Sequence, residues 1–384
     1  MTPLPIPSPQ AQKHSQQLVE LIRRTIQQAA GWIDFAQFMH MALYAPGLGY
    51  YSAGSQKFGK GGDFVTAPEI SPLFAQSLAN QITQVLEITQ GDILELGAGT
   101  GKLAADILLT LDEQECLPSN YYILEVSDHL RHVQREWLIT KLPHTLMQRV
   151  VWLDALPQEF SGIILGNEVL DAIPTHLVHT SSDGILERGV VAKDEGFTWQ
   201  DKPLVEPNLL SVISKLRLPD GYITEVCPAA SGLITSLASV LTQGVILMID
   251  YGFSAREYYH PQRNQGTLMC HYQQLAHTDP LIYIGLQDIT AHVDFTAVAQ
   301  AGIDHGLQLN GFCNQAQFLM NCGILEVMSQ VSPHDMAKYA PLAAAAQKLL
   351  SPAEMGDLFK VIALSKNIEL SLLGFSAGDK SHTL

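Results

Sequence analysis

Residues 93 to 103 read Ile93-Leu-Glu-Leu-Gly-Ala-Gly-Thr-Gly-Lys-Leu103. An apolar run is followed by glycines at every second position and then by residues with helical spacing, which predicts a strand, a tight turn and a helix. Gly97 and Gly99 allow the backbone to turn sharply and to approach a ligand without interference from a Cβ atom. Because the helix that follows begins with free N–H groups, the stretch predicts a ligand-binding loop.

The spacing of the glycines separates three classes of ligand. A P-loop needs glycine where this chain has Leu96 and serine or threonine where it has Leu103, and a dinucleotide-binding loop needs a third glycine at Lys102. The observed order is an acid followed by alternate glycines: Glu95, Gly97, Gly99 and Gly101. This order is typical of class I methyltransferases, in which the loop surrounds the amino-acid end of S-adenosylmethionine. The acid suits a ligand with an ammonium group and no phosphate; a dinucleotide site and a structural turn are the alternatives.

Strands and helices alternate on both sides of this loop. Apolar runs typical of buried parallel strands occupy 92–96, 121–125, 149–153, 162–165 and 245–249, and two further core strands are expected at 307–310 and 359–364. Helical spacing occupies 70–86, 103–111 and 130–138. This alternation predicts an α/β fold with a parallel, Rossmann-like sheet. The segment 176–205 interrupts this alternation of strands and helices with Asp-Gly and Glu-Gly turns. We therefore predict a β-meander in an inserted α+β lid lobe.

The same pattern divides the chain into five segments. We expect an N-terminal helical cover, the first half of the core, the lid lobe, the second half of the core and a flexible tail, at 1–80, 81–175, 176–240, 241–370 and 371–384. Within the cover, Asp34 is the expected N-cap of a helix, and the Pro- and Gln-rich residues 1–14 are expected to be loose.

Composition narrows the partners and the compartment. The formal charge of -16 disfavours a nucleic-acid partner, because phosphate backbones would be repelled. Five scattered cysteines without a C-x-x-C pair, no signal or transit pattern at the N-terminus and no apolar run of about 18 residues favour a cytoplasmic protein that does not insert into a membrane. His129 and His132 are spaced i, i+3 and are interpreted as part of a solvated helix face, so no metal site is expected.

Two acids after the next strands suit the rest of the cofactor. Glu125 ends the strand after the glycine loop, where a carboxylate can accept hydrogen bonds from both ribose hydroxyls. Asp154 follows the third strand and can accept from the adenine amino group. A solvated surface acid is the alternative at either position.

Acceptor-side residues are expected after the fourth strand, in Gly166-Asn-Glu-Val-Leu-Asp-Ala-Ile-Pro-Thr-His176. Here Asn167 precedes Glu168, and Asp171 lies three residues further on. A helical turn would place both carboxylates on one face, where they could grip a guanidinium group by charge-assisted hydrogen bonds. The alternative is an acid at a helix start beside a solvated one.

A second polar cluster, Asp288-Ile-Thr-Ala-His-Val-Asp-Phe295, supplies candidates for proton transfer. His292 and Asp294 are able to accept or shuttle a proton. A capping aspartate beside a packed histidine is an equally weighted interpretation.

Taken together, these segments resemble the MidA-like methyltransferases, a family that includes the mitochondrial complex I assembly-factor arginine methyltransferase. The resemblance runs in collinear order over about residues 32 to 365. Besides the glycine loop, it covers 43–52, 62–71, 123–131, 166–174, 250–252, 266–268, 288–295 and 359–364.

The resemblance implies a class I methyltransferase core with added N-terminal helices and a smaller lobe, and S-adenosylmethionine as the methyl donor. It implies further donor-binding residues at Gly62, Asp63, Thr66, Ala98, Val126 and Asn167. It also implies a protein acceptor, since the mitochondrial members make symmetric dimethylarginine on a complex I subunit. Without a transit peptide, this chain is expected to be a bacterial relative; its oligomeric state stays open, with a homodimer as one possibility.

Three functions follow from this interpretation. The first is a protein arginine methyltransferase. The second is a methyltransferase that acts on a small molecule or on another side chain, and the third is an assembly chaperone that keeps the cofactor fold without turnover. An open acidic groove would favour a peptide acceptor, and a closed apolar pocket a small one.

Overall fold

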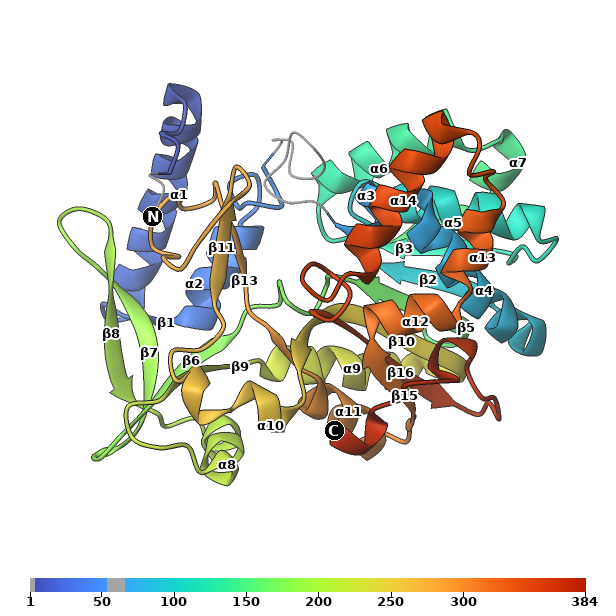
Figure 1. Cartoon of the computed structure of the whole chain (residues 1–384). Helices are drawn as coiled ribbons and strands as arrows, with labels where there is room; N and C mark the ends of the chain where they lie inside the picture. The colour runs from blue at the N-terminus through green and yellow to red at the C-terminus, as the bar shows by residue number, and fades with distance from the viewer. Residues whose placement is uncertain (1–3, 54–65) are drawn as a thin grey trace. The chain divides into compact units, whose positions relative to one another are not determined.

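The computed structural model describes residues 4–53 and 66–384 (Figure 1). They divide into two compact units, each built from separate stretches of the chain. The first, called the sheet unit below, contains 66–170, 231–254 and 293–384. The second, called the meander unit, contains the described residues 4–53 together with 171–230 and 255–292.

The sheet unit is built on an eight-stranded sheet. Along the sheet the order is β15 (Gln308–Asn314), β16 (Phe359–Lys366), β10 (Leu241–Phe253), β5 (Phe160–Asn167), β2 (Asp92–Leu96), β3 (Tyr121–Leu124) and β4 (Val150–Leu153), and β14 (Val293–Asp294) pairs with β10. The run from β10 to β4 is parallel, whereas β16 pairs antiparallel with both β10 and β15. The predicted Rossmann-like α/β sheet is confirmed, including all seven expected core strands.

Helices surround the hydrophobic core of this unit. They are α3 (Ala67–Ile70), α4 (Pro72–Thr89), α5 (Lys102–Glu113), α6 (Asp128–Lys141), α7 (His144–Met147), most of α9 (Pro228–Val240), α11 (Phe295–Asp304), α12 (Gln315–Asn321), α13 (Ile324–Ser329) and α14 (Met336–Leu350). The core cluster takes Leu78 and Ile82 from α4, Ile107 from α5 and Ile163 from β5, all of them fully buried. Burial of these apolar side chains on both faces explains why the central strands read as continuous apolar runs.

The meander unit contains a five-stranded antiparallel sheet and a smaller three-stranded one. The larger has the order β1 (Ile33–Asp34), β7 (Gly184–Ala192), β6 (His176–Ser181) and β9 (Ile223–Val226), with β8 (Phe197–Pro203) on β7. The smaller consists of β12 (Leu275–His277), β11 (Met269–Tyr272) and β13 (Asp288–Thr290). The β-meander predicted over 176–205 is therefore confirmed as β6, β7 and β8.

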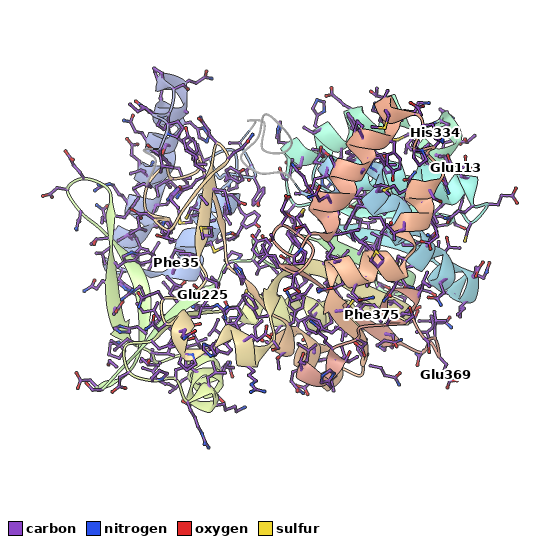
Figure 2. All side chains as sticks on the ribbon, in the orientation of Figure 1. Phe35, Glu113, Glu225, His334, Glu369 and Phe375 are labelled. Carbon is purple, nitrogen blue, oxygen red and sulfur yellow. The ribbon has the colours of Figure 1, made fainter. Side chains whose placement is uncertain are left out.

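The N-terminal helices pack into this same unit. They are α1 (Pro9–Gln28) and α2 (Phe35–Tyr44); the unit also contains α8 (Pro207–Leu216), α10 (Ala255–Tyr258) and the turn η1 (Pro261–Arg263). Phe35, which Figure 2 labels, shares a core with Leu18, Val190 and Ile289. As predicted, Asp34 caps α2, accepting from the Gln37 N–H at 2.8 Å.

The two chain ends differ from the sequence-based expectation. Helix α1 begins at Pro9, within the stretch expected to be loose, because Ser8 caps it and proline is favoured in a first helical turn. The C-terminal residues, expected as a flexible tail, form the short turns η2 (Leu373–Phe375) and η3 (Ser381–Thr383). There Phe375 packs against Phe318 with ring centroids 5.4 Å apart, and the Asp379 carboxylate accepts from the Phe312 N–H (Figure 2). No helix in the described part of the chain is long and apolar enough to cross a membrane.

Candidate functional site

The glycine loop joins β2 to α5 at the carboxyl edge of the parallel sheet. The backbone φ angles of Gly97, Gly99 and Gly101 are +59°, +54° and +82°, in the left-handed region that other residues rarely adopt. The Gly97 N–H donates to the carbonyl of Leu124, which ends the neighbouring strand. Helix α5 begins directly afterwards at Lys102 without a side-chain cap. The Lys102 N–H donates to the Thr100 hydroxyl at 3.4 Å, so the N–H groups that this helix start can offer to a ligand are those of the residues after Lys102.

Glu95 lies on β2 below this loop and is almost completely buried. Burial raises its pKa to about 7, although the Tyr121 hydroxyl donates to its Oε2 at 2.8 Å and lowers the pKa in part. A carboxyl group in this state gains charge readily when a cation arrives. This behaviour suits an acid expected to face an ammonium group.

Glu125, at the carboxyl end of β3, is held by two donors. The Ser127 N–H donates to Oε1 and the Gln134 side chain to Oε2, each at 2.9 Å. Burial raises the pKa of Glu125, and these two hydrogen bonds oppose that rise. Its carboxylate oxygens have lone pairs left for further donors. The adjacent Val126 is 80% exposed, so its side chain is accessible beside the carboxylate.

Asp154, expected near the adenine, pairs with Arg131 of α6. The distance from Arg131 Nη1 to Asp154 Oδ1 is 2.6 Å, and the Asp154 side chain is 93% exposed. The same guanidinium donates to the carbonyls of Glu125 and Leu153, so it links the ends of β3 and β4. Asp154 thus lies at the expected edge of the sheet, with one oxygen engaged by Arg131.

Gln134 was not identified from the sequence. It lies on α6, is fully buried, and contacts the glycine loop, Glu125 and Trp152 of β4. A glutamine inside a helix has no distinctive pattern around it. The helical spacing from Arg131 to Gln134 was the available signal, since residues three apart share one face.

The segment after β5 differs from its prediction. Asn167 ends the strand, and its Nδ2 donates to Glu168 Oε1 at 3.1 Å, while its buried Oδ1 has no hydrogen-bond partner within the described residues. Glu168 has a φ of +54°, and residues 168–175 form no helix. The predicted helical turn, with Glu168 and Asp171 on one face, is therefore wrong. The competing constraint is tertiary: the Leu170 N–H donates to the buried carboxylate of Asp250.

Asp171 itself belongs to the meander unit and is 5% exposed. Its carbonyl accepts from the Ala291 N–H, next to His292. The His292 N–H donates to the Thr267 hydroxyl at 3.0 Å. Asp171 is therefore buried within that unit, and His292 is partly buried.

Asp294 is a capping residue. Its Oδ1 accepts from the N–H groups of Thr296 and Ala297 at 3.0 and 3.2 Å, at the start of α11. Of the two interpretations that the sequence left open, the capping aspartate is the one that the structure shows. These capping bonds involve Oδ1 alone, and a role of Asp294 in proton transfer stays a prediction.

Two expected donor-site residues, Gly62 and Asp63, lie outside the described part of the chain. Thr66 is described and precedes α3 as its N-cap residue. Helix α3 approaches the glycine loop through Glu69, which accepts from the Thr100 hydroxyl at 2.6 Å. Ala98 lies in the loop and is buried.

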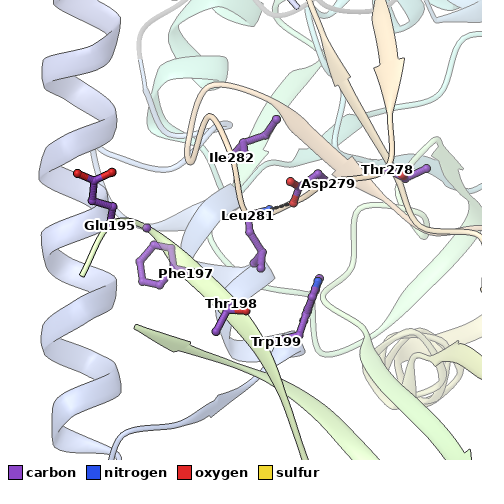
Figure 3. Close-up of a pocket in the computed structure, with 9 residues that line it drawn as sticks. Glu195, Phe197, Thr198, Trp199, Thr278, Asp279, Leu281 and Ile282 are labelled. Atoms are coloured by element: carbon purple, nitrogen blue, oxygen red, sulfur yellow. Dashed lines mark hydrogen bonds between the residues drawn. The ribbon is translucent and has the colours of Figure 1, made fainter. Parts of the chain in front are cut away.

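The meander unit has polar features of its own. An open pocket of about 430 Å³ lies between β8 and the residues after β12, with Phe197, Trp199 and Leu281 in its lining (Figure 3). It contains none of the residues predicted as site residues.

Elsewhere in this unit, one ligand atom each of Asp34, His176 and Glu187 lie within 4.8 Å of one another, a spacing that could hold a metal ion. Two of these residues already pair with each other, since His176 Nδ1 lies 2.6 Å from Glu187 Oε1.

Comparisons with known proteins agree with this geometry. Residues 75–313, more than half of the chain, match the family model Methyltransf_28, described as "Putative S-adenosyl-L-methionine-dependent methyltransferase". The chain belongs to this family. A crystal structure of a COG1565 superfamily member from Burkholderia thailandensis, bound to S-adenosyl-homocysteine, is 47% identical and covers 100% of both chains with a TM-score of 0.96.

Curated relatives are more distant but nearly as long. The protein arginine methyltransferase NDUFAF7 of Danio rerio is 28% identical over 376 residues, which cover 89% of this chain and 86% of the relative. The human protein of the same name is also 28% identical, over 88% of this chain and 80% of the relative. The MidA-like family resemblance seen in the sequence is thereby confirmed.

The residues at the sheet edge fit the family's methyl donor, S-adenosylmethionine. The left-handed loop would surround the methionine end, and the unpartnered Oδ1 of Asn167 is able to accept from an ammonium group. Glu125 would accept from the ribose, with Val126 beside it. The donor supplies an activated methyl group on sulfur, and the chain supplies orientation and the exclusion of water.

Proposed function

We propose that this methyltransferase transfers the methyl group to an arginine side chain of a protein. The observation that carries this proposal is the similarity to proteins named protein arginine methyltransferase over almost the full length of both chains. From the family resemblance described in the sequence analysis, we further propose an acceptor of the kind found in respiratory-complex assembly.

Methyl transfer to arginine requires a carboxylate beside the donor. An uncharged guanidine nitrogen attacks the methyl carbon, the carbon–sulfur bond breaks, and the products are S-adenosylhomocysteine, methylarginine and one proton. A carboxylate that binds the guanidinium orients the attacking nitrogen by paired hydrogen bonds. Glu168 is the candidate of the sheet unit, since it follows β5 directly and its Oε1 is oriented by the Asn167 amide. For Asp171 and His292 we retain the roles that the sequence predicts, a second carboxylate and a proton acceptor, as separate proposals.

Radiolabelled methyl transfer tests the acceptor. Wild-type protein would be incubated with S-adenosylmethionine labelled on the methyl group and an extract of source cells that lack the gene. Labelled protein would then be hydrolysed and its amino acids separated. We expect the label in methylated arginine, a loss of at least about tenfold in Glu168→Gln, and full labelling in Glu113→Gln, a variant of an exposed acid far along α5.

Other outcomes would contradict the proposal in distinct ways. Label in small molecules or in another amino acid would identify a methyltransferase with a different acceptor. Binding of S-adenosylhomocysteine without any labelled product would favour the non-catalytic assembly chaperone.

A further inference from the structure

Gln134 joins three segments of the sheet unit that border the donor site. Its Nε2 donates to the Gly99 carbonyl at 3.1 Å and to Glu125 Oε2 at 2.9 Å, and its Oε1 accepts from the Trp152 indole at 3.0 Å. The side chain is fully buried. Both amide hydrogens and the amide oxygen are therefore engaged, each by a different segment.

Each of these partners lies where a different part of the donor is expected. Gly99 belongs to the loop for the methionine end, Glu125 is the candidate for the ribose, and Trp152 lies two residues before Asp154. The helix backbone takes part as well, because a Cβ atom at Gly101 would lie 3.3 Å from the Gln134 Cα. Helix α6 thus packs closely against the loop at the residue whose side chain holds the neighbouring carbonyl.

Burial alone does not explain this arrangement. Gln81 of α4 is also fully buried, but it donates to Gln84 and accepts from the Gly374 N–H, away from the glycine loop and Glu125. The partners of Gln134 instead include a carboxylate that must accept hydrogen bonds to bind ribose. Without the amide, Glu125 would lose the donor to its Oε2 and keep the Ser127 N–H on its Oε1, and burial would favour the protonated acid.

We propose that Gln134 is a positioning residue of the donor site, acting through Glu125 and Gly99 rather than by contact with the donor. Its amide fixes the orientation of the Glu125 carboxylate and the position of the Gly99 carbonyl. This inference rests on the donor site described above and does not depend on the identity of the acceptor.

Calorimetric titration with S-adenosylhomocysteine tests the proposal on the full chain. Gln134→Met keeps the volume of the side chain and removes its hydrogen bonds, so we expect binding to weaken by about 10- to 100-fold. Gln81→Met makes the same chemical change at a buried site elsewhere in the sheet unit. It should lower the melting temperature as Gln134→Met does, yet change the affinity by less than about twofold.

A double-mutant cycle tests whether Gln134 acts through Glu125. In a Glu125→Gln background, Gln134→Met should cost much less affinity than in the wild type, because the shared partner is already lost. Equal weakening by Gln134→Met and Gln81→Met, unchanged affinity in Gln134→Met, or fully additive effects in the cycle would each overturn the proposal. A wild-type protein that does not bind S-adenosylhomocysteine would instead overturn the donor site itself.

Discussion

At the scale of single residues, the donor site combines a left-handed glycine loop with buried acids. Left-handed backbone at Gly97, Gly99 and Gly101 brings the main chain to the sheet edge. Glu95 is buried beneath the loop with a pKa of about 7, so its charge depends on what binds nearby. A group of this kind makes donor binding sensitive to pH in the physiological range.

We therefore expect the affinity for S-adenosylhomocysteine to fall by about tenfold between pH 8 and pH 6, as Glu95 becomes protonated and loses its attraction for the ammonium group. Glu95→Gln should flatten this dependence, and Glu113→Gln should retain it. Titration calorimetry at four pH values would measure both slopes. The same slope in Glu95→Gln as in the wild type would assign the titration to another group.

The residue pattern revealed part of this site before the structure did. Glu95, the alternate glycines and Glu125 follow strands directly, so their sheet-edge position could be predicted from local sequence. Gln134 could not, because its three partners come from three different segments. The turn after Asn167 was mispredicted because its conformation depends on Asp250, 83 residues beyond Asn167 along the chain.

At the scale of elements, β6 and β7 are joined by a histidine–carboxylate pair. His176 Nδ1 lies 2.6 Å from Glu187 Oε1. Burial alone would lower the pKa of His176, but the hydrogen bond with Glu187 and the charges of Asp34, Glu187 and Glu206 outweigh it and raise the pKa. The pair therefore stabilises the meander sheet while the histidine is charged.

Because this pKa is raised on folding, its contribution is fully present below the unfolded value near 6.5 and is lost as pH rises through the folded value. We expect the wild type to lose unfolding free energy between pH 6 and pH 8.5 relative to His176→Asn, because the raised pKa of His176 is crossed in this range. Urea unfolding at the two pH values would measure the difference. His40→Asn, an exposed histidine of α2 in the same unit, serves as the control, and an equal pH effect in both variants would refute the assignment.

Elements with strong local signals were the easiest to predict. The parallel strands, the β-meander and the capped helix α2 lie at the positions predicted from the sequence. The ends of the chain were harder, because the C-terminal turns are held by long-range contacts such as that of Asp379 with Phe312. Local polarity suggested a frayed tail, and tertiary hydrogen bonds override that preference.

At the scale of the whole molecule, the chain forms two compact units from interleaved stretches. The described candidates for donor binding all belong to the sheet unit. Sequence segmentation separated an N-terminal cover from a lid lobe, whereas helices α1 and α2 share a core with the meander strands. Such a division cannot be predicted from linear order, since the stretches that form one core lie far apart along the chain.

This division predicts where a ligand stabilises the protein. S-adenosylhomocysteine at about 100 times its Kd should add about 2.7 kcal/mol to the opening free energy of the sheet unit. Hydrogen exchange followed by mass spectrometry should show strong protection in β2, α5 and α6. Peptides from β6 to β8 should exchange at an unchanged rate, and equal protection of both regions would contradict the prediction.

The central claim is that the loop after β2 binds the methyl donor. Calorimetric titration with S-adenosylhomocysteine, with NADH as the control ligand, tests it most directly in the wild type, Gly99→Val and Gly306→Val. Both glycines have positive φ, so valine meets the same backbone preference at each, and Gly306 lies after α11, outside the glycine loop, with nothing within 4 Å of its Cβ position. We predict saturable binding by the wild type and Gly306→Val, at least about 100-fold weaker binding by Gly99→Val, and no response to NADH. Equal affinity in Gly99→Val and the wild type, or no binding by the wild type at millimolar ligand, would contradict the account.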